Sequence, residues 1–132
     1  MAAVISIVDD DKAVRDALQR MLGAHGFSAN AFASAEQFLN WPHLDETACL
    51  ILDVRMPGMT GLALHHALSS RGCRIPTILI TACPTDGERE RAIAAGAVSY
   101  LAKPLSEAVL LDLVRDALPP DSACPSDDKI EV

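Results

Sequence analysis

The chain is poor in aromatic residues and in positive charge. Its 132 residues include one Trp, one Tyr and three Phe, and 11 Lys and Arg stand against 18 Asp and Glu, for a formal net charge of −7. A protein of this sign repels the phosphates of nucleic acids and of anionic membranes, so neither is an expected direct partner. No run of about 18 apolar residues is present and no basic start leads into an apolar signal segment. A cytoplasmic location is therefore expected.

A recognisable zinc or disulfide pattern is also lacking. None of the four cysteines stands in a CxxC pair, and the four histidines are scattered. The adjacent His65 and His66 are expected to point to different faces of a helix. Cys49 opens an apolar run and is predicted to be a small core residue. A metal site built from Cys and His is therefore not expected.

What is present is enough apolar sequence for one folded domain. Half of the residues are hydrophobic and 22% are charged, which argues against intrinsic disorder. The length suits a single domain with a real core. We expect residues 1–118 to form that domain. Residues 119–132 begin with two prolines, are rich in Ser, Pro and Asp, and are predicted to be a flexible tail or the remnant of a linker.

Strand and helix signals alternate five times along this domain. The expected strands are residues 4–8, 27–32, 48–53, 75–81 and 98–102, and helices are expected from about 12, 34, 61, 85 and 106 onward. Asp10 or Asp11 is predicted to cap the first helix, which Gly23 or Gly26 ends. Five such units with short connections predict the α/β class, with a doubly wound, parallel (βα)5 sheet. Periodicity alone does not fix the strand order.

Acidic residues and a lysine directly follow three of the expected strands. Asp9, Asp10 and Asp11 come after the first strand, Asp53 ends the third, and Lys103 follows the fifth. The C-termini of parallel strands open onto one crevice, so these side chains are expected to converge. Carboxylate oxygens suit Mg²⁺, which binds few protein ligands and keeps places for phosphoryl oxygens. The sequence therefore predicts a Mg²⁺ and phosphoryl site in a protein that is itself phosphorylated.

Each of these residues also has a plainer interpretation. Asp53 is predicted to be a nucleophile that forms an aspartyl-phosphate, but a strand-end Asp can also bond to its own loop. Lys103 suits a phosphoryl oxygen or the Asp53 carboxylate, but surface lysines are common. Thr81 ends a strand and can offer its hydroxyl to the same group. Asp11 fits an ordinary helix N-terminus, where the helix dipole favours acidic residues.

In this order and on these strand ends, the residues resemble the receiver domain of response regulators in two-component signalling. The resemblance covers residues 4–118 and is carried by the segments 8–11, 53–61, 75–81 and 95–104. The segments 34–39 and 53–61 are most similar to the FixJ-type subgroup. The resemblance implies the flavodoxin-like fold with strand order 2-1-3-4-5.

The resemblance also implies roles at the crevice. Asp53 would accept the phosphoryl group, and Asp9 and Asp10 would hold Mg²⁺ together with Asp53 and the backbone carbonyl of Arg55. Lys103 would contact the phosphoryl oxygens. The donor would be a sensor histidine kinase. The chain would be no enzyme in its own right, since it would catalyse only its own phosphorylation and dephosphorylation.

A switch and an output surface are implied in the same way. The Ala82 amide would contact the phosphoryl group, Thr81 would move its hydroxyl toward it, and the ring of Tyr100 would follow Thr81. The fourth helix, fifth strand and fifth helix would then change their surface, for dimerisation of two copies or for an effector protein. The mixed charges at residues 88–91 are expected to form a solvated helix face that sets partner choice by charge.

Some features depart from the family and leave alternatives open. Residues 82–87 differ from the Gly-His-Gly-Asp-like sequence common in FixJ-type domains, and Cys83 leaves the phosphoryl lifetime open. A degenerate receiver that binds partners without phosphorylation is one alternative. A flavodoxin-like enzyme is disfavoured because Asp9, Asp10 and Asp11 stand where a flavin site would carry a Ser/Thr/Gly-rich phosphate loop. A phosphatase is disfavoured because Arg55 stands where an aspartyl-phosphate hydrolase carries a second Asp. No helix-turn-helix output domain follows Pro120, so the chain is either a natural single-domain regulator or ends at a linker.

Overall fold

A computed structural model describes residues 4–118, and in it five parallel strands form one sheet. The strands are β1 (Val4–Val8), β2 (Ser28–Phe32), β3 (Cys49–Asp53), β4 (Thr77–Thr81) and β5 (Ser99–Ala102). The helices are α1 (Lys12–Ala24), α2 (Ala35–Leu39), α3 (Gly61–Ser70), α4 (Asp86–Ala94) and α5 (Glu107–Ala117), with a short 3₁₀ turn η1 (Leu44–Glu46). The strand order is β2-β1-β3-β4-β5, so the predicted doubly wound sheet and the order that the resemblance implied are both confirmed.

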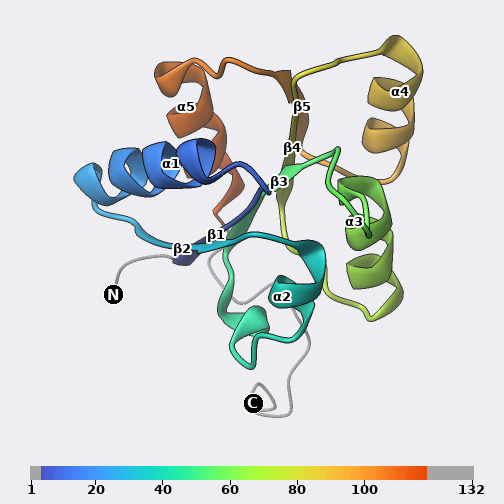
Figure 1. Ribbon diagram of the computed structural model, residues 1–132, viewed down its shortest axis with the longest axis horizontal. Helices are drawn as coiled ribbons and strands as arrows, with labels where there is room; N and C mark the ends of the chain where they lie inside the picture. Colours follow the sequence, from blue (N-terminus) through green and yellow to red (C-terminus); the bar gives the residue numbers. More distant parts are fainter. Residues whose placement is uncertain (1–3, 119–132) are drawn as a thin grey trace.

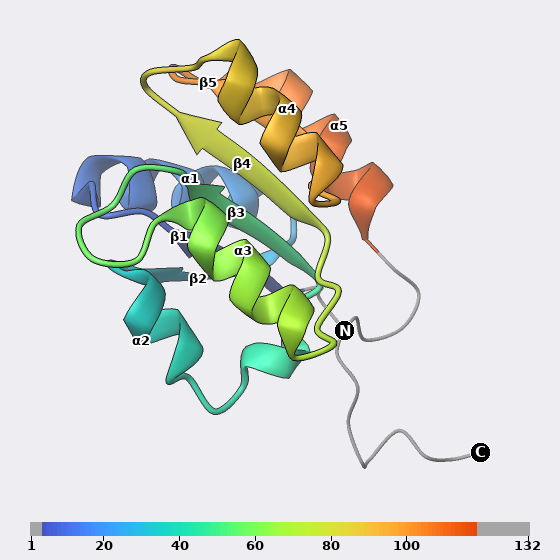
Figure 2. The same ribbon diagram turned by 90° about the vertical axis from the view of Figure 1, so that its right-hand side faces the viewer.

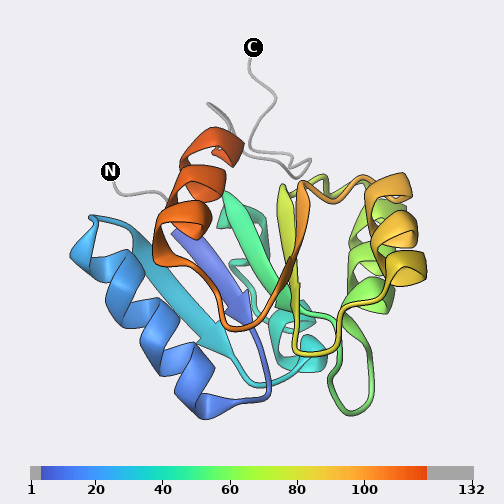
Figure 3. The same cartoon turned by 90° about the horizontal axis from the view of Figure 1, so that it is seen from above.

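Helices cover both faces of the sheet (Figure 1). Helices α1 and α5 lie on one face, and α2, α3 and α4 lie on the other, which Figure 3 shows from a second direction. Each layer has its own core. Phe38, Leu64 and Leu68 pack on the face of α2 and α3, and Leu18, Leu22 and Val114 pack on the face of α1 and α5.

The central strands are apolar throughout because both of their faces are covered. Along β3, Leu50 and Leu52 belong to one core while Cys49 and Ile51 belong to the other, as the two-residue repeat of a strand requires. Each large side chain buried in this way stabilises the fold by about 1.5–3 kcal/mol. The burial of Cys49 confirms its prediction as a core residue, and burial raises the pKa of its thiol to about 12.

Each of the helices α1 to α5 begins at a residue whose side-chain oxygen accepts a backbone N–H. These caps are Asp11, Ser34, Thr60, Thr85 and Ser106. Such a cap contributes about 1 kcal/mol. Asp11, rather than Asp10, caps α1 through a 2.9 Å bond from the Ala13 amide. Asp10 therefore remains available to the crevice.

Four of the five expected strands begin one or two residues later in the structure than predicted. Strand β4 begins at Thr77 rather than at residue 75, because Pro76 has no amide to donate to the ladder. The turn η1 was not predicted from the sequence, and α1 continues to Ala24. The predicted tail, residues 119–132, lies outside the described residues.

Candidate functional site

Three carboxylates meet at the C-terminal edge of the sheet. Strands β1 and β3 are parallel neighbours with Val8 opposite Leu52, so Asp9 and Asp53 leave the sheet side by side. Oxygens of Asp9, Asp10 and Asp53 all lie within 4.8 Å of one another. Asp9 is fully buried, Asp53 is 4% exposed, and Asp10 faces solvent. The convergence predicted from the sequence is therefore observed.

Lys103 reaches the same crevice from the end of β5. Its Nζ lies 2.9 Å from Asp9 Oδ2 and 3.7 Å from Asp53 Oδ1. The expected contact with Asp53 is thus present but is the longer of the two. Burial alone would lower the pKa of Lys103, but the hydrogen bond and charge of Asp9, together with the charge of Asp53, outweigh it and raise the pKa. Lys103 is a fixed cation between the two buried carboxylates.

The environment of Asp53 disfavours its charged form. Burial raises the pKa of Asp53 to about 6, and the negative charge of Asp9 acts in the same direction. The Lys103 ammonium and the Arg55 amide, which donates to Asp53 Oδ1 at 3.4 Å, oppose this rise only in part. A carboxylate in this situation gains from an additional positive charge.

The donor set in the crevice fits Mg²⁺. Its oxygens are hard ligands, and two of the three carboxylates are buried. Asp9 Oδ1 accepts a hydrogen bond from the Asp11 amide at 2.9 Å. Asp9 Oδ2 is buried and forms the ion pair with Lys103, and among the described residues it has no other partner. A divalent cation would relieve the mutual repulsion of the three carboxylates.

Thr81 lies on the strand beside Asp53. Asp53 is opposite Ile80 in the parallel pair of β3 and β4, so Thr81, the next residue, ends β4 at the crevice. Its side chain is fully buried, and its Oγ1 accepts a hydrogen bond from the Cys83 amide at 3.1 Å. Ala82, the residue expected to offer its amide to a phosphoryl group, is exposed directly after the strand. Both residues therefore lie at the C-terminal end of β4, beside the strand that ends in Asp53.

Tyr100 points into the protein. It is 1% exposed, and its hydroxyl donates to Glu88 Oε1 at 2.5 Å and accepts the Thr85 amide at 3.1 Å. Burial and the hydrogen bond to Glu88 raise the pKa of the phenol. The Tyr100 hydroxyl is thus held at the start of α4. Figure 2 shows that this helix lies beside β4 and β5.

Glu88 is the residue at this site that the sequence interpretation missed. Residues 88–91 were expected to form a solvated face, and this prediction is wrong for Glu88, which is 6% exposed. Its Oε2 lies 3.5 Å from Nη2 of Arg55. The reason is geometric, because Glu88 occupies the third position after the Thr85 cap and faces the sheet. The capping pattern Thr85-x-x-Glu88 was the available signal.

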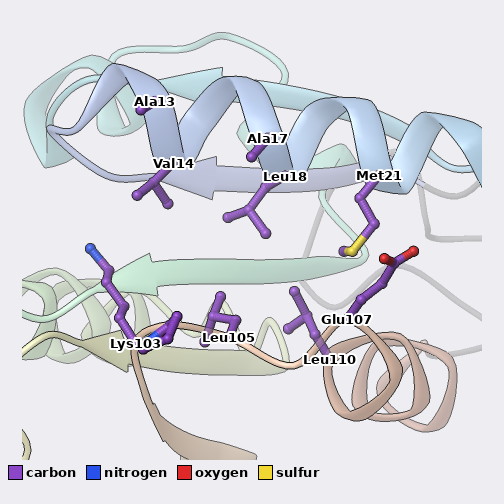
Figure 4. A pocket seen from close by; sticks show the side chains of 10 residues that line it. Ala13, Val14, Ala17, Leu18, Met21, Lys103, Leu105, Glu107 and Leu110 are labelled. Atoms are coloured by element: carbon purple, nitrogen blue, oxygen red, sulfur yellow. The ribbon is translucent and has the colours of Figure 1, made fainter.

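A mostly apolar cavity of about 610 Å³ adjoins the crevice between α1 and α5. Figure 4 shows Val14, Leu18 and Met21 from α1 facing Leu105 and Leu110 across it. Lys103 lines this cavity and also contacts Asp9, so it lies at the boundary between the apolar cavity and the carboxylate crevice.

No helix in the described range of 4–118 is long and apolar enough to cross a membrane. This agrees with the absence of long apolar runs in the sequence.

Comparison with known proteins identifies the family. Residues 5–115 match the response regulator receiver domain. The chain is 44% identical over 117 residues to the response regulator protein TodT of Pseudomonas putida and 37% identical over 117 residues to the transcriptional regulatory protein TdiR of Thauera aromatica. Each alignment covers 89% of this chain and 52% of the relative, so the chain spans about half the length of these curated relatives.

Solved structures give the same result. The response regulator StyR superimposes with a TM-score of 0.83 at 37% identity, covering 89% of this chain and 60% of that one. The structure named FixJ-N superimposes with a TM-score of 0.78 at 32% identity, covering 89% of this chain and 94% of that one. Given its carboxylate crevice, its strand order and these matches, the chain belongs to the response regulator receiver domain family.

Proposed function

We propose that this chain is a phosphorylation-switched signalling domain in which Asp53 accepts a phosphoryl group from a histidine kinase. The observation that carries the proposal is the position of Asp53, a buried carboxylate held between two other carboxylates and a lysine at the end of a central strand. Receiver domains generally bind Mg²⁺ at such an acidic pocket. Here Asp9, Asp10, Asp53 and the Arg55 carbonyl would hold it, and when bound it would neutralise charge on the phosphoryl oxygens.

The chain's own residues account for the transfer. An Asp53 oxygen attacks phosphorus in line with the phosphorus–nitrogen bond of a phosphohistidine, so the oxygen–phosphorus bond forms as the imidazole leaves with the electron pair of the broken bond. Lys103, already 3.7 Å from Asp53 Oδ1, pairs with a phosphoryl oxygen. The Ala82 amide and the Thr81 hydroxyl, at the end of the neighbouring strand, donate to the other oxygens. The chemistry is confined to the chain's own carboxylate, so we propose no other enzymatic activity.

An output surface is proposed at α4, β5 and α5. Three large hydrophobic side chains among residues 4–118 are exposed, one on α4, one directly before β5 and one on α5: Ile93 is 51% exposed, Val98 41% and Val109 47%. An exposed apolar side chain is stabilised when another protein removes it from water. This face would serve dimerisation of two copies or contact with an effector.

The experiment is the intact mass and the elution volume of the chain after incubation with Mg²⁺ and acetyl phosphate, and then with a partner kinase. We expect wild type to gain the mass of one phosphoryl group, and Asp53→Asn to gain none. Asp112→Asn, an exposed carboxylate on α5, is the matched control and should be phosphorylated like wild type. A chelator should abolish the adduct.

The alternative is a degenerate receiver that binds its partner without phosphorylation. A wild type that stays unmodified with both donors would support this alternative and overturn the proposal. An adduct that persists in Asp53→Asn would place the acceptor at another residue.

A further inference from the structure

Every polar atom of Asp9 is held by another part of the chain. Its amide donates to the Phe32 carbonyl oxygen at 3.1 Å, and its carbonyl oxygen accepts a hydrogen bond from Arg15 Nη1 at 2.8 Å. Its carboxylate accepts the Asp11 amide at one oxygen and pairs with Lys103 at the other. Because these partners come from separate parts of the chain, Asp9 has little freedom to move.

The neighbouring Asp10 lacks such contacts. It faces solvent, and its carboxylate accepts no hydrogen bond within residues 4–118. One of its oxygens nevertheless lies within 4.8 Å of oxygens of Asp9 and Asp53, in the crevice where Mg²⁺ would bind. The position of this carboxylate therefore depends on the backbone that carries it.

Arg15 acts on that backbone. The carbonyl oxygen of Asp9 belongs to the same planar peptide unit as the nitrogen and Cα of Asp10. A bond that fixes this oxygen therefore also fixes the plane from which the Asp10 side chain leaves. The bond is charge-assisted, because a guanidinium donates it, and such bonds are stronger than those between neutral groups. Without it, the peptide could turn and carry the Asp10 carboxylate away from Asp53.

Arg15 holds the acidic pair without neutralising it. Its guanidinium bonds to a neutral carbonyl oxygen, and none of the ion pairs within residues 4–118 includes Arg15. The carboxylate oxygens are thus left to a metal. As a positive charge near the crevice, Arg15 repels a cation, but as a hydrogen-bond donor it holds a ligand in place for one. These two effects predict opposite results when the side chain is removed.

We propose that Arg15 is a positioning residue that raises the Mg²⁺ affinity of the crevice by fixing the peptide between Asp9 and Asp10. The guanidinium itself would not touch the metal, since its partner is the Asp9 carbonyl oxygen. Side chains that orient metal ligands in this way typically change the affinity by about 10–100-fold. This inference rests on the proposed function, which assigns Mg²⁺ to the crevice.

The test is isothermal titration of the chain with MgCl₂ at constant ionic strength, which measures binding without any phosphodonor. Arg15→Met removes the donor and the charge but keeps an apolar stem of similar shape. It is compared with Asp10→Asn and with the two substitutions combined. Arg20→Met, which removes the same charge from an exposed position on α1, is the matched control. Circular dichroism checks that each variant is folded. If Arg15→Met does not fold, Arg15→Gln takes its place, because its side chain is polar but shorter.

We expect Arg15→Met to raise the dissociation constant of Mg²⁺ by more than about twofold and up to about tenfold, the lower end of the range for such supporting residues. Arg20→Met should bind Mg²⁺ as tightly as wild type or more tightly. In the Asp10→Asn background, the loss caused by Arg15→Met should shrink to about twofold or less, because the ligand that Arg15 positions is already gone. A general distortion of α1 would weaken binding in both backgrounds.

Three results would overturn the role of Arg15. The first is an Arg15→Met affinity within about twofold of wild type or above it, and the second is an equal loss in Arg20→Met. The third is a loss that persists in the Asp10→Asn background. In each case Mg²⁺ binding by wild type would leave the proposed function intact. A wild type that binds no Mg²⁺ would instead contradict the metal site of the proposed function, and the role of Arg15 with it.

Discussion

At the scale of single residues, Asp53 carries a conflict between function and stability. A nucleophile must lose its proton, yet burial and the charge of Asp9 raise the pKa of Asp53 to about 6. The unfolded chain has an Asp pKa of about 3.9. The folded chain therefore binds this proton more tightly than the unfolded chain does, and ionisation of Asp53 opposes folding. Lys103 reduces the penalty without removing it, because its closer partner is Asp9.

This conflict predicts a pH dependence of stability in metal-free buffer. The protonated Asp53 carboxyl contributes to the free energy of unfolding. This contribution is fully present below a pH of about 4 and is lost as the pH rises through about 6. Between a pH of about 4 and a pH above about 6, wild type should lose about 1–3 kcal/mol of unfolding free energy relative to Asp53→Asn. The upper figure applies if solvent does not screen the charge of Asp53. Urea unfolding, followed by the fluorescence of Trp41, measures both proteins at each pH.

The comparison of the two proteins isolates one carboxyl, since every other acidic group titrates in both. Any constant effect of the Asn side chain cancels in the pH dependence. A difference that stays flat from pH 4 to pH 7 would show that Asp53 is solvated in solution.

At the scale of elements, the approach of α3 to β3 fixes the backbone of the acceptor. The Gly61 amide donates to the Val54 carbonyl oxygen at 2.9 Å, directly after Asp53. A Cβ on Gly61 would overlap the Asp53 carbonyl oxygen and lie 2.9 Å from Val54 Cα. Both neighbours are backbone atoms, one at the end of the central strand β3 and one in the residue directly after it, so neither can move aside cheaply. The glycine at the start of α3 is therefore required by this close contact.

Gly61→Ala is accordingly expected to destabilise the fold by about 2–4 kcal/mol and to slow phosphorylation of Asp53. Gly87→Ala is a matched control in the first turn of α4, where the added Cβ would meet only the flexible end of Arg91 at 3.6 Å. That control should be neutral or slightly stabilising, because Ala has the better helix propensity. Urea unfolding gives the stability, and the rate of the acetyl phosphate adduct gives the effect on the site. Equal stabilities for the two variants would contradict the close contact.

The elements also show what could be predicted from the sequence. Five apolar runs, each ending at a turn or a polar residue, predicted the strands, and the edge at which their carboxylates meet followed from parallel pairing. The strand order did not follow from periodicity and came from the family resemblance. The capping pattern Thr85-x-x-Glu88 could have placed Glu88 at the start of a helix, but its burial could not be predicted, because it depends on Tyr100 from β5 and Arg55 from the loop after β3. Contacts between elements far apart in the chain leave no periodic pattern in the sequence.

At the scale of the whole molecule, negative charge is concentrated as well as abundant. The chain has a formal net charge of −7, and three of its carboxylates share one crevice. Repulsion within this crevice opposes folding in the absence of a cation. A ligand that binds only the folded state stabilises it by an amount that grows with its concentration, about 2.7 kcal/mol at a hundred times its dissociation constant. Mg²⁺ is therefore expected to act on the stability of the entire domain through this one site.

We predict that MgCl₂ raises the unfolding free energy of wild type at constant ionic strength. Well above the dissociation constant, a plot of this free energy against the natural logarithm of the Mg²⁺ concentration should approach a slope of RT. Asp10→Asn removes one exposed ligand and should weaken apparent Mg²⁺ affinity about tenfold, which lowers the gain by about 1.4 kcal/mol at saturating metal. Asp112→Asn removes the same charge from α5, away from the crevice, and should respond like wild type. Equal responses of the two variants would mean that Mg²⁺ acts by general screening, and the three carboxylates would then hold no metal.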